Sequence, residues 1–96
     1  FHNLKNLAIS INIEASELLE IFQWDDNHEI NKKIKKKEFK NRISEEVADV
    51  LLYLIRFSEI AELDLESICL DKIKKNGKKY PIKLSRGKST KYTFLK

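Results

Sequence analysis

Two pairs of acidic residues have the spacing and the surroundings of a metal site. Glu14 and Glu17 are three residues apart, as are Glu46 and Asp49, so each pair projects from one side of a helix. Each pair borders an apolar stripe, and two helices packed antiparallel on these stripes would bring four carboxylates to the edge of a core. Such carboxylates raise each other's pKa values unless a cation lies between them. Because neither motif contains His or Cys, the pattern favours Mg²⁺, with Mn²⁺ possible, over Zn²⁺.

Basic residues later in the chain complement these acids. Lys72 and Asn76 are four residues apart, so on a helix they share one face and can reach phosphate oxygens. Mg²⁺ held by carboxylates keeps coordination positions open for water and substrate phosphates. A single Glu-x-x-Glu is usually a solvated helix face, and a lysine run is usually solvent-facing charge. Only their combination points to chemistry on a phosphorylated substrate.

Acidic and basic blocks alternate along the chain. The net charge is −5 over residues 1–30, +6 over 31–42, −7 over 43–71 and +10 over 72–96, which gives the overall +4. A basic C-terminal block of this kind is typical of a solvated surface or a nucleic-acid patch. The alternative is that the acidic blocks hold metal and the basic block holds the phosphates attached to it.

Apolar spacing predicts an all-α protein. The 3.6-residue period predicts one long helix over residues 3–24 and a second over about 43–62. Residues 28–42 have few apolar side chains and are predicted to form a short exposed helix or an ordered connector. Asp64 is the predicted N-cap of a third helix, which Asn76-Gly77 would end. Tyr80-Pro81 ends the regular pattern, and residues 82–96 are predicted to be an extended basic arm.

The second long helix is apolar on too many sides for a small monomer. Eleven of the fifteen residues from Val47 to Ala61 are apolar or aromatic, so most of this helix must be covered. A chain of 96 residues cannot easily supply that cover, which predicts a partner subunit. The expected fold is therefore an antiparallel helix bundle whose four-helix core is completed by oligomerisation.

Composition bounds the remaining possibilities. The length fits a single domain over residues 1–96, and 42% hydrophobic with 35% charged residues excludes a disordered chain. Cys69 is the one cysteine, which excludes an internal disulfide and a multi-cysteine zinc site. No apolar run reaches the ~18 residues of a membrane span, so we expect a cytoplasmic protein. Because the chain opens with Phe1 and contains no Met, further residues are expected upstream.

These motifs resemble the MazG-like superfamily of all-α nucleoside triphosphate pyrophosphohydrolases. Its signature is Glu-x-x-Glu, a spacer and Glu-x-x-Asp, which here has 28 residues between Glu17 and Glu46. Within the superfamily the chain is most similar to the dCTP pyrophosphatase branch. That similarity extends over nearly the whole chain and includes FHNLKNL at 1–7, FQW at 22–24, EEVADVLLY at 45–53 and KYP at 79–81. Ala15-Ser16 stands where the family commonly has a Gly.

The resemblance implies hydrolysis between the α- and β-phosphates of dCTP or a modified pyrimidine nucleotide, in a homodimer or homotetramer. It implies that the four acidic residues hold Mg²⁺ and that a glutamate of the first pair accepts the proton of the attacking water. The other implied site residues contact the phosphates, sugar or base. They are Tyr53, Lys72 and Asn76 for phosphate or sugar, Phe1, His2 and Trp24 for the base, and more weakly Arg86, Lys88 and Lys91 for phosphate.

Two alternatives remain open at this stage. A non-catalytic basic helical module would bind nucleic acid through residues 72–96, with steep salt dependence and no need for the acidic pairs. It has no recognisable reading motif, so no stable nucleic-acid partner is expected. A catalytically silent, metal-binding homologue that serves as an assembly partner is distinguished only by an activity assay.

Overall fold

The structure is a computed structural model that describes residues 2–79 and consists, over that range, of helices without strands. The helices are α1 (Leu4–Phe22), α2 (Asn27–Lys33), α3 (Lys37–Ile60) and α4 (Leu65–Lys79). The predicted all-α class is therefore confirmed. The chain divides into two compact units, Phe1–Glu62 and Leu63–Lys96. Of the second unit, α4 and the residues that lead into it are described, and each unit is considered by itself.

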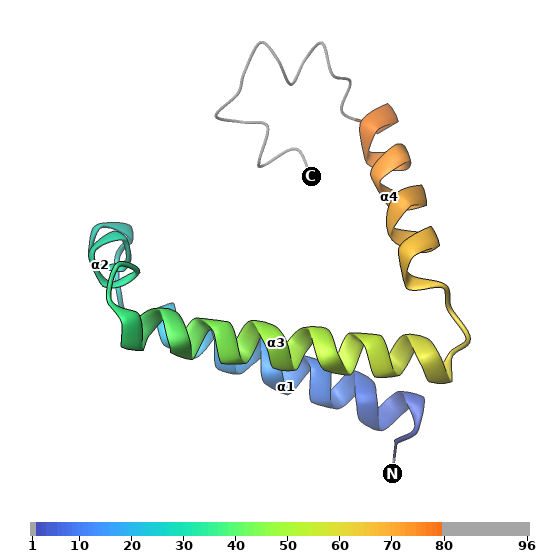
Figure 1. Ribbon diagram of the computed structural model, residues 1–96, viewed down its shortest axis with the longest axis horizontal. Helices are drawn as coiled ribbons and strands as arrows, with labels where there is room; N and C mark the ends of the chain where they lie inside the picture. Colours follow the sequence, from blue (N-terminus) through green and yellow to red (C-terminus); the bar gives the residue numbers. More distant parts are fainter. Residues whose placement is uncertain (1, 80–96) are drawn as a thin grey trace. The chain divides into compact units, whose positions relative to one another are not determined.

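The first unit is an antiparallel pair of long helices. The apolar stripes of α1 and α3 face each other, and the two helices run side by side in opposite directions (Figure 1). Leu7 and Ile21 of α1 and Phe39 of α3 are the buried apolar residues of the described chain, with Leu7 only 2% exposed. Phe39 also meets Phe22 edge to face, with ring centroids 5.8 Å apart. The packing fixes the register in which α1 and α3 present their polar edges.

Side-chain caps begin α1, α2 and α4, whereas α3 has no side-chain cap. The Asn3 Oδ1 atom accepts a hydrogen bond from the Asn6 amide at 2.8 Å, which starts α1. Asp26 and Glu29 form a reciprocal capping box at the start of α2. The predicted cap of the third helix is confirmed, because Asp64 Oδ1 accepts from the Ser67 amide at 3.1 Å. These caps satisfy amides that the helices cannot pair internally.

Two predicted helix boundaries were wrong. The second long helix begins at Lys37 instead of about 43, because Phe39 is buried and holds the first turn of α3 in the core. The third helix does not end at Asn76-Gly77 but continues to Lys79. Gly77 has no positive φ, so it extends the helix instead of forming the left-handed cap that glycine often makes. The expected ending at Tyr80-Pro81 and the arm over 82–96 lie outside the described residues.

Much apolar surface of the first unit stays exposed. On α3, the side chains of Val47 and Leu51 are about half exposed, and Leu52 is 62% exposed. On α1, Ile9, Ile13 and Leu19 are exposed as well. None of the described helices combines the length and the hydropathy that a bilayer crossing requires. No contact within the described part of this unit covers these apolar faces, and their cover by a partner subunit stays a prediction.

Candidate active site

Three of the four predicted carboxylates converge between α1 and α3. Glu14, Glu17 and Glu46 each place one carboxylate oxygen within 4.8 Å of the others. Glu14 and Glu17 lie one turn apart on α1, and the antiparallel packing brings α3 alongside so that Glu46 faces them. Oxygens at this spacing can share one hard divalent ion.

Two of these carboxylates contain a buried oxygen that lacks a hydrogen bond. Within the described residues, the Oε2 atoms of Glu14 and Glu46 are inaccessible to solvent and have no hydrogen-bond partner. Buried acceptors are normally paired, because an unpaired one loses its water without compensation. No described lysine or arginine forms an ion pair with either residue. The site offers only oxygen ligands, which lie close enough together to share one ion, and it contains two unpaired oxygens. These properties fit Mg²⁺ or Mn²⁺ and give no preference to a softer metal.

The electrostatics of the cluster also favour an added positive charge. Three effects raise the pKa of Glu14 to about 7. The largest is a hydrogen bond with the Glu17 side chain, followed by desolvation and by repulsion from Glu17, Asp49 and Glu46. The pKa of Glu46 is also raised. Desolvation is the largest cause, followed by a hydrogen bond with Glu17 and by repulsion from Glu17 and Asp49. Without a cation the cluster therefore retains a proton that an isolated carboxylate would lose.

Asp49 takes a more peripheral position than the sequence implied. It lies on α3 three residues after Glu46 and acts on Glu14 and Glu46 through its charge, but it is not one of the three residues whose oxygens meet within 4.8 Å. Tyr53, one turn further along α3, is half-buried. Asp49 and Tyr53 thus extend the polar edge from the cluster toward the N-terminal end of α1.

His2 and Trp24 lie at opposite ends of α1. His2 precedes the cap residue Asn3, and Trp24 follows the last turn of the helix and is 86% exposed. At about 1.5 Å per residue, the 19 residues of α1 separate them by about 28 Å. One nucleobase therefore cannot contact His2 and Trp24 of the same chain.

Lys72 and Asn76 belong to the second unit, which is described by itself. Both lie on α4, where their four-residue spacing puts them on one face of the helix as predicted. Lys72 is exposed and Asn76 is half-buried. Phe1 lies outside the described residues, as do Arg86, Lys88 and Lys91.

The structure adds Arg42 to the residues around the cluster. A small hollow of about 240 Å³ beside the carboxylates is lined by Glu17, Glu20, Ile21, Arg42, Glu45 and Glu46. Arg42 was not predicted, because it was assigned to the exposed connector over 28–42. Its position four residues before Glu46 was the available signal, since that spacing places two residues on one face of a helix.

The comparisons with known proteins agree with this geometry. The MazG-like family matches residues 9–95. The chain is 35% identical over 95 residues to dCTP pyrophosphatase 1 of Rattus norvegicus and of Homo sapiens, covering 99% of this chain and 56% of each relative. It thus spans little more than half the length of these curated relatives. The crystal structure of a pyrophosphatase from Archaeoglobus fulgidus superimposes with a TM-score of 0.76 at 43% identity, covering 83% of this chain and 73% of that one.

The match is broad enough to decide the family. It includes both acidic motifs and the two helices that carry them, and the structural neighbour has the same helical fold at substantial sequence identity. The resemblance inferred from the Glu-x-x-Glu and Glu-x-x-Asp motifs is confirmed. The chain belongs to the MazG-like family.

Proposed function

We propose that the chain is a divalent-metal-dependent nucleotide pyrophosphohydrolase that converts a nucleoside triphosphate and water to the monophosphate and pyrophosphate. The observation that carries this proposal is the set of converging carboxylates, in which Glu14 and Glu46 keep a buried, unpaired oxygen. The similarity to the dCTP pyrophosphatases supports a nucleotide substrate, and the similarity to the archaeal pyrophosphatase supports pyrophosphatase chemistry.

Glu14, Glu17 and Glu46 would hold Mg²⁺, with Asp49 completing the set from the next turn of α3. When bound there, the ion would supply positive charge that polarises the α-phosphate and favours ionisation of the attacking water. The water oxygen forms a bond to the α-phosphorus while the bond from that phosphorus to the bridging oxygen breaks. The electron pair leaves with pyrophosphate, and a glutamate of the first pair accepts the water's proton.

The remaining predicted residues would orient the nucleoside. Tyr53 lies on the same edge of α3 as the carboxylates and would contact the sugar or a phosphate, with Lys72 and Asn76 contributing phosphate contacts from α4. Phe1, His2 and Trp24 would form the base pocket. Because α1 separates His2 from Trp24 in one chain, a pocket that uses both residues must combine two copies of the protein.

A substrate panel tests the proposed activity. The full chain is incubated with Mg²⁺ and each dNTP, each NTP or a 5-modified pyrimidine deoxynucleoside triphosphate. The products are separated as monophosphate, diphosphate, pyrophosphate and orthophosphate. We expect monophosphate and pyrophosphate in equal amounts, with dCTP or a 5-modified pyrimidine deoxynucleotide giving the highest kcat/KM. Release of orthophosphate would indicate a different bond, and no release from any nucleotide would contradict the proposal.

Glu46→Gln is the sharpest variant of the cluster. It keeps the size of the side chain but removes the charge, so we expect turnover to fall at least about a hundredfold, the upper range found when residues that only support a metal ligand are changed. Glu59→Gln is the matched control, because Glu59 lies on the same helix and makes only an exposed 3.8 Å ion pair with Arg56. Unchanged Mg²⁺-dependent turnover in Glu46→Gln would overturn the assignment of the cluster.

A further inference from the structure

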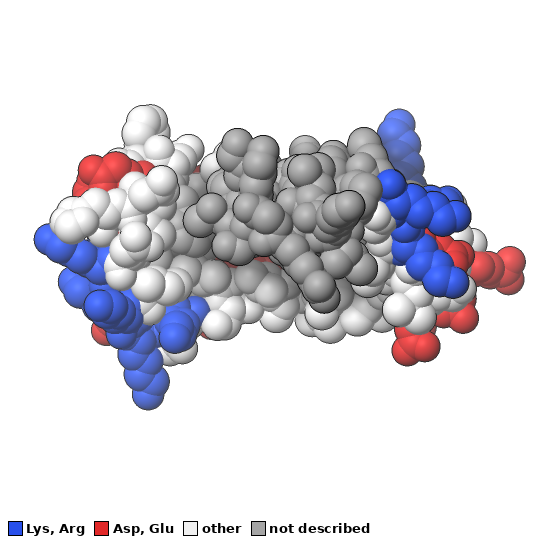
Figure 2. Space-filling model, turned by 90° about the horizontal axis from the view of Figure 1, so that it is seen from above, with Lys and Arg blue, Asp and Glu red and all other residues white. Residues whose placement is uncertain are grey.

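A second, basic hollow adjoins the carboxylate cluster in the first unit. It has a volume of about 600 Å³ and is lined by residues at the end of α1, at the end of α2 and in the first turns of α3. Four of its lining residues are basic, namely Lys33, Lys36, Lys37 and Arg42, and Glu38 is the one acid among them. Figure 2 shows the basic side chains of this region gathered at the α2 end of the unit.

Most of these cations form no ion pair within the described residues, although Glu38 lines the same hollow and four glutamates line the adjoining hollow with Arg42. Lys33 is the exception, because its Nζ lies 2.8 Å from Asp25 Oδ2. Lys36, Lys37 and Arg42 form no ion pair with any described side chain. Like charges at such a site repel each other and attract an anion, most strongly a polyanion.

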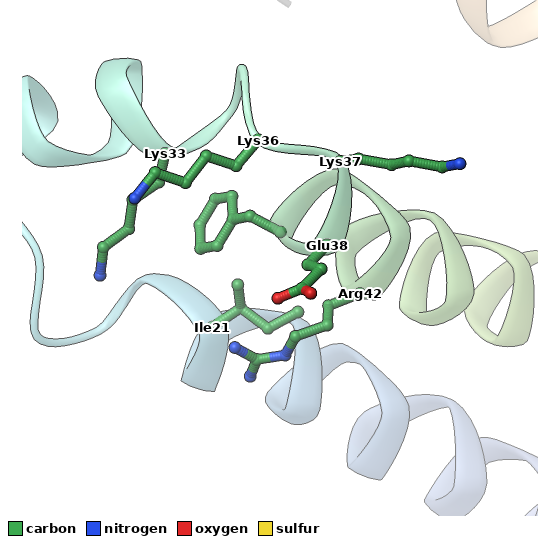
Figure 3. A pocket seen from close by; sticks show the side chains of 7 residues that line it. Ile21, Lys33, Lys36, Lys37, Glu38 and Arg42 are labelled. Atoms are coloured by element: carbon green, nitrogen blue, oxygen red, sulfur yellow. The ribbon is translucent and has the colours of Figure 1, made fainter.

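Figure 3 shows how these side chains lie around the hollow. Lys33 and Lys36 lie on the side formed by α2 and the turn that follows it, and Arg42 lies across from them and extends its guanidinium toward Ile21 of α1. The amine of Lys37 points away from the others. Lys36 and Arg42 therefore approach the hollow from two different sides, which suits a ligand with several phosphate oxygens.

Arg42 connects this hollow to the cluster. Arg42 and Ile21 line both the basic hollow and the smaller hollow that contains Glu17 and Glu46. Arg42 is four residues from Glu46 on α3, which is a rise of about 6 Å along the helix. This rise is close to the separation of the α- and γ-phosphates in a triphosphate. A guanidinium binds phosphate oxygens through two parallel hydrogen bonds, which an ammonium group cannot do.

We propose that Arg42 and Lys36 bind the terminal phosphates of the substrate and hold pyrophosphate as it leaves. This inference rests on the proposed function, because it takes the α-phosphate to lie at the carboxylate cluster. The triphosphate then runs from the cluster toward α2, and the nucleoside runs the opposite way along α3 toward Tyr53. Arg42 stabilises the negative charge that develops on the leaving pyrophosphate, and the site favours triphosphates over diphosphates.

Binding of inorganic pyrophosphate tests the site without any turnover. The full chain is titrated with pyrophosphate by calorimetry in the absence of metal, and Arg42→Gln and Lys36→Gln are compared with Lys40→Gln and Lys35→Gln. The control residues are exposed, carry the same charge and do not line the hollow. We expect about tenfold weaker binding for Arg42→Gln, a smaller loss for Lys36→Gln and none for the controls, with unfolding midpoints unchanged.

Steady-state kinetics give the second readout. Arg42→Gln should raise the KM for the triphosphate and the inhibition constant of pyrophosphate by about tenfold each, while the Mg²⁺-induced rise in the unfolding midpoint stays as in the unaltered protein. Equal pyrophosphate binding in all five proteins would overturn this inference and leave the hydrolase proposal intact. If Arg42→Gln weakens pyrophosphate binding but the unaltered protein hydrolyses no nucleotide, the hydrolase proposal alone would be rejected.

A longer polyanion is the remaining alternative occupant. A single-stranded oligonucleotide is therefore titrated as well. Suppose that it binds more tightly than pyrophosphate and that Lys35→Gln and Lys40→Gln weaken its binding as much as Arg42→Gln does. This result would show a diffuse nucleic-acid surface. That result would overturn the assignment of the hollow to the substrate's phosphates.

Discussion

Glu14 and Glu46 each hold a carboxylate oxygen where solvent does not reach it and no described donor meets it. Few side chains are buried in the described part of the chain, so this arrangement lowers stability unless something else compensates for it. We expect a divalent ion to do so by replacing the proton that the raised pKa of Glu14 favours, so stability and metal binding at this site should be coupled.

The coupling predicts how pH affects the metal-free protein. The pKa of Glu14 is raised to about 7, above its value in an unfolded chain, so the folded state binds this proton more tightly. Its stabilising contribution is complete below about pH 4.5 and is lost as pH rises through about 7. We therefore expect the unfolding midpoint in EDTA to fall between pH 6 and pH 8, and Glu14→Gln to reduce that fall while Glu59→Gln preserves it.

Mg²⁺ should act in the opposite direction. Because the ion competes with the proton for the same oxygens, its stabilisation should be larger at pH 8 than at pH 6, reaching about 2.7 kcal/mol at a concentration of 100 times Kd. Thermal unfolding with and without Mg²⁺ at both pH values measures this. An equal Mg²⁺ effect at pH 6 and pH 8 would contradict a carboxylate site.

Residue types and spacing predicted which carboxylates meet but not how deeply they lie. The i, i+3 spacing specifies a helix face, and three of the four acids converge as expected. The outlying position of Asp49 depends on the register between α1 and α3, which two apolar stripes alone do not determine. Arg42 was missed for a related reason, since seven basic residues in a short segment conceal the one that faces the site.

At the scale of elements, the long helices were easier to predict than the segment between them. The apolar period determined α1 to within two residues, because no glycine or proline interrupts it. The start of α3 was misplaced because Phe39 is an isolated apolar residue among lysines, and its burial depends on contacts with Phe22 and Lys33 across the turn. Such contacts arise only in the folded chain.

The capping box of α2 provides a test at this scale. The Asp26 Oδ1 atom accepts from the Glu29 amide at 2.8 Å, and Glu29 Oε1 accepts from the Asp26 amide at 3.4 Å. Asp26→Ala removes this cap and should lower the free energy of unfolding by about 1 kcal/mol, as measured by urea denaturation. Asp26→Asn should restore most of the loss. The control is Asn27→Ala, at the first helical position; an equal loss there would show that the cap is not responsible.

At the scale of the whole molecule, two observations concern a second copy of the chain. The exposed apolar side chains of α1 and α3, among them Leu19 and Leu52 at 62% exposure each, leave a surface that a small protein normally covers. In addition, His2 and Trp24 lie too far apart in one chain to contact the same base. We predict a dimer or tetramer that covers this surface, and a base pocket that uses both residues requires His2 of one copy to meet Trp24 of another.

The predicted oligomer can be separated from the metal site by one substitution. Leu52→Glu places a charge on the exposed apolar face of α3, whereas Ser44→Glu places the same charge at an exposed polar position of that helix. Light scattering at micromolar concentration should give a dimer or tetramer for the unaltered protein and for Ser44→Glu, and a lower mass for Leu52→Glu. Because the carboxylates of one α1–α3 pair come from a single chain, Leu52→Glu should still be stabilised by Mg²⁺ while its KM differences among the four dNTPs decrease. A monomeric unaltered protein with full base preference would contradict both the oligomer and the shared base pocket.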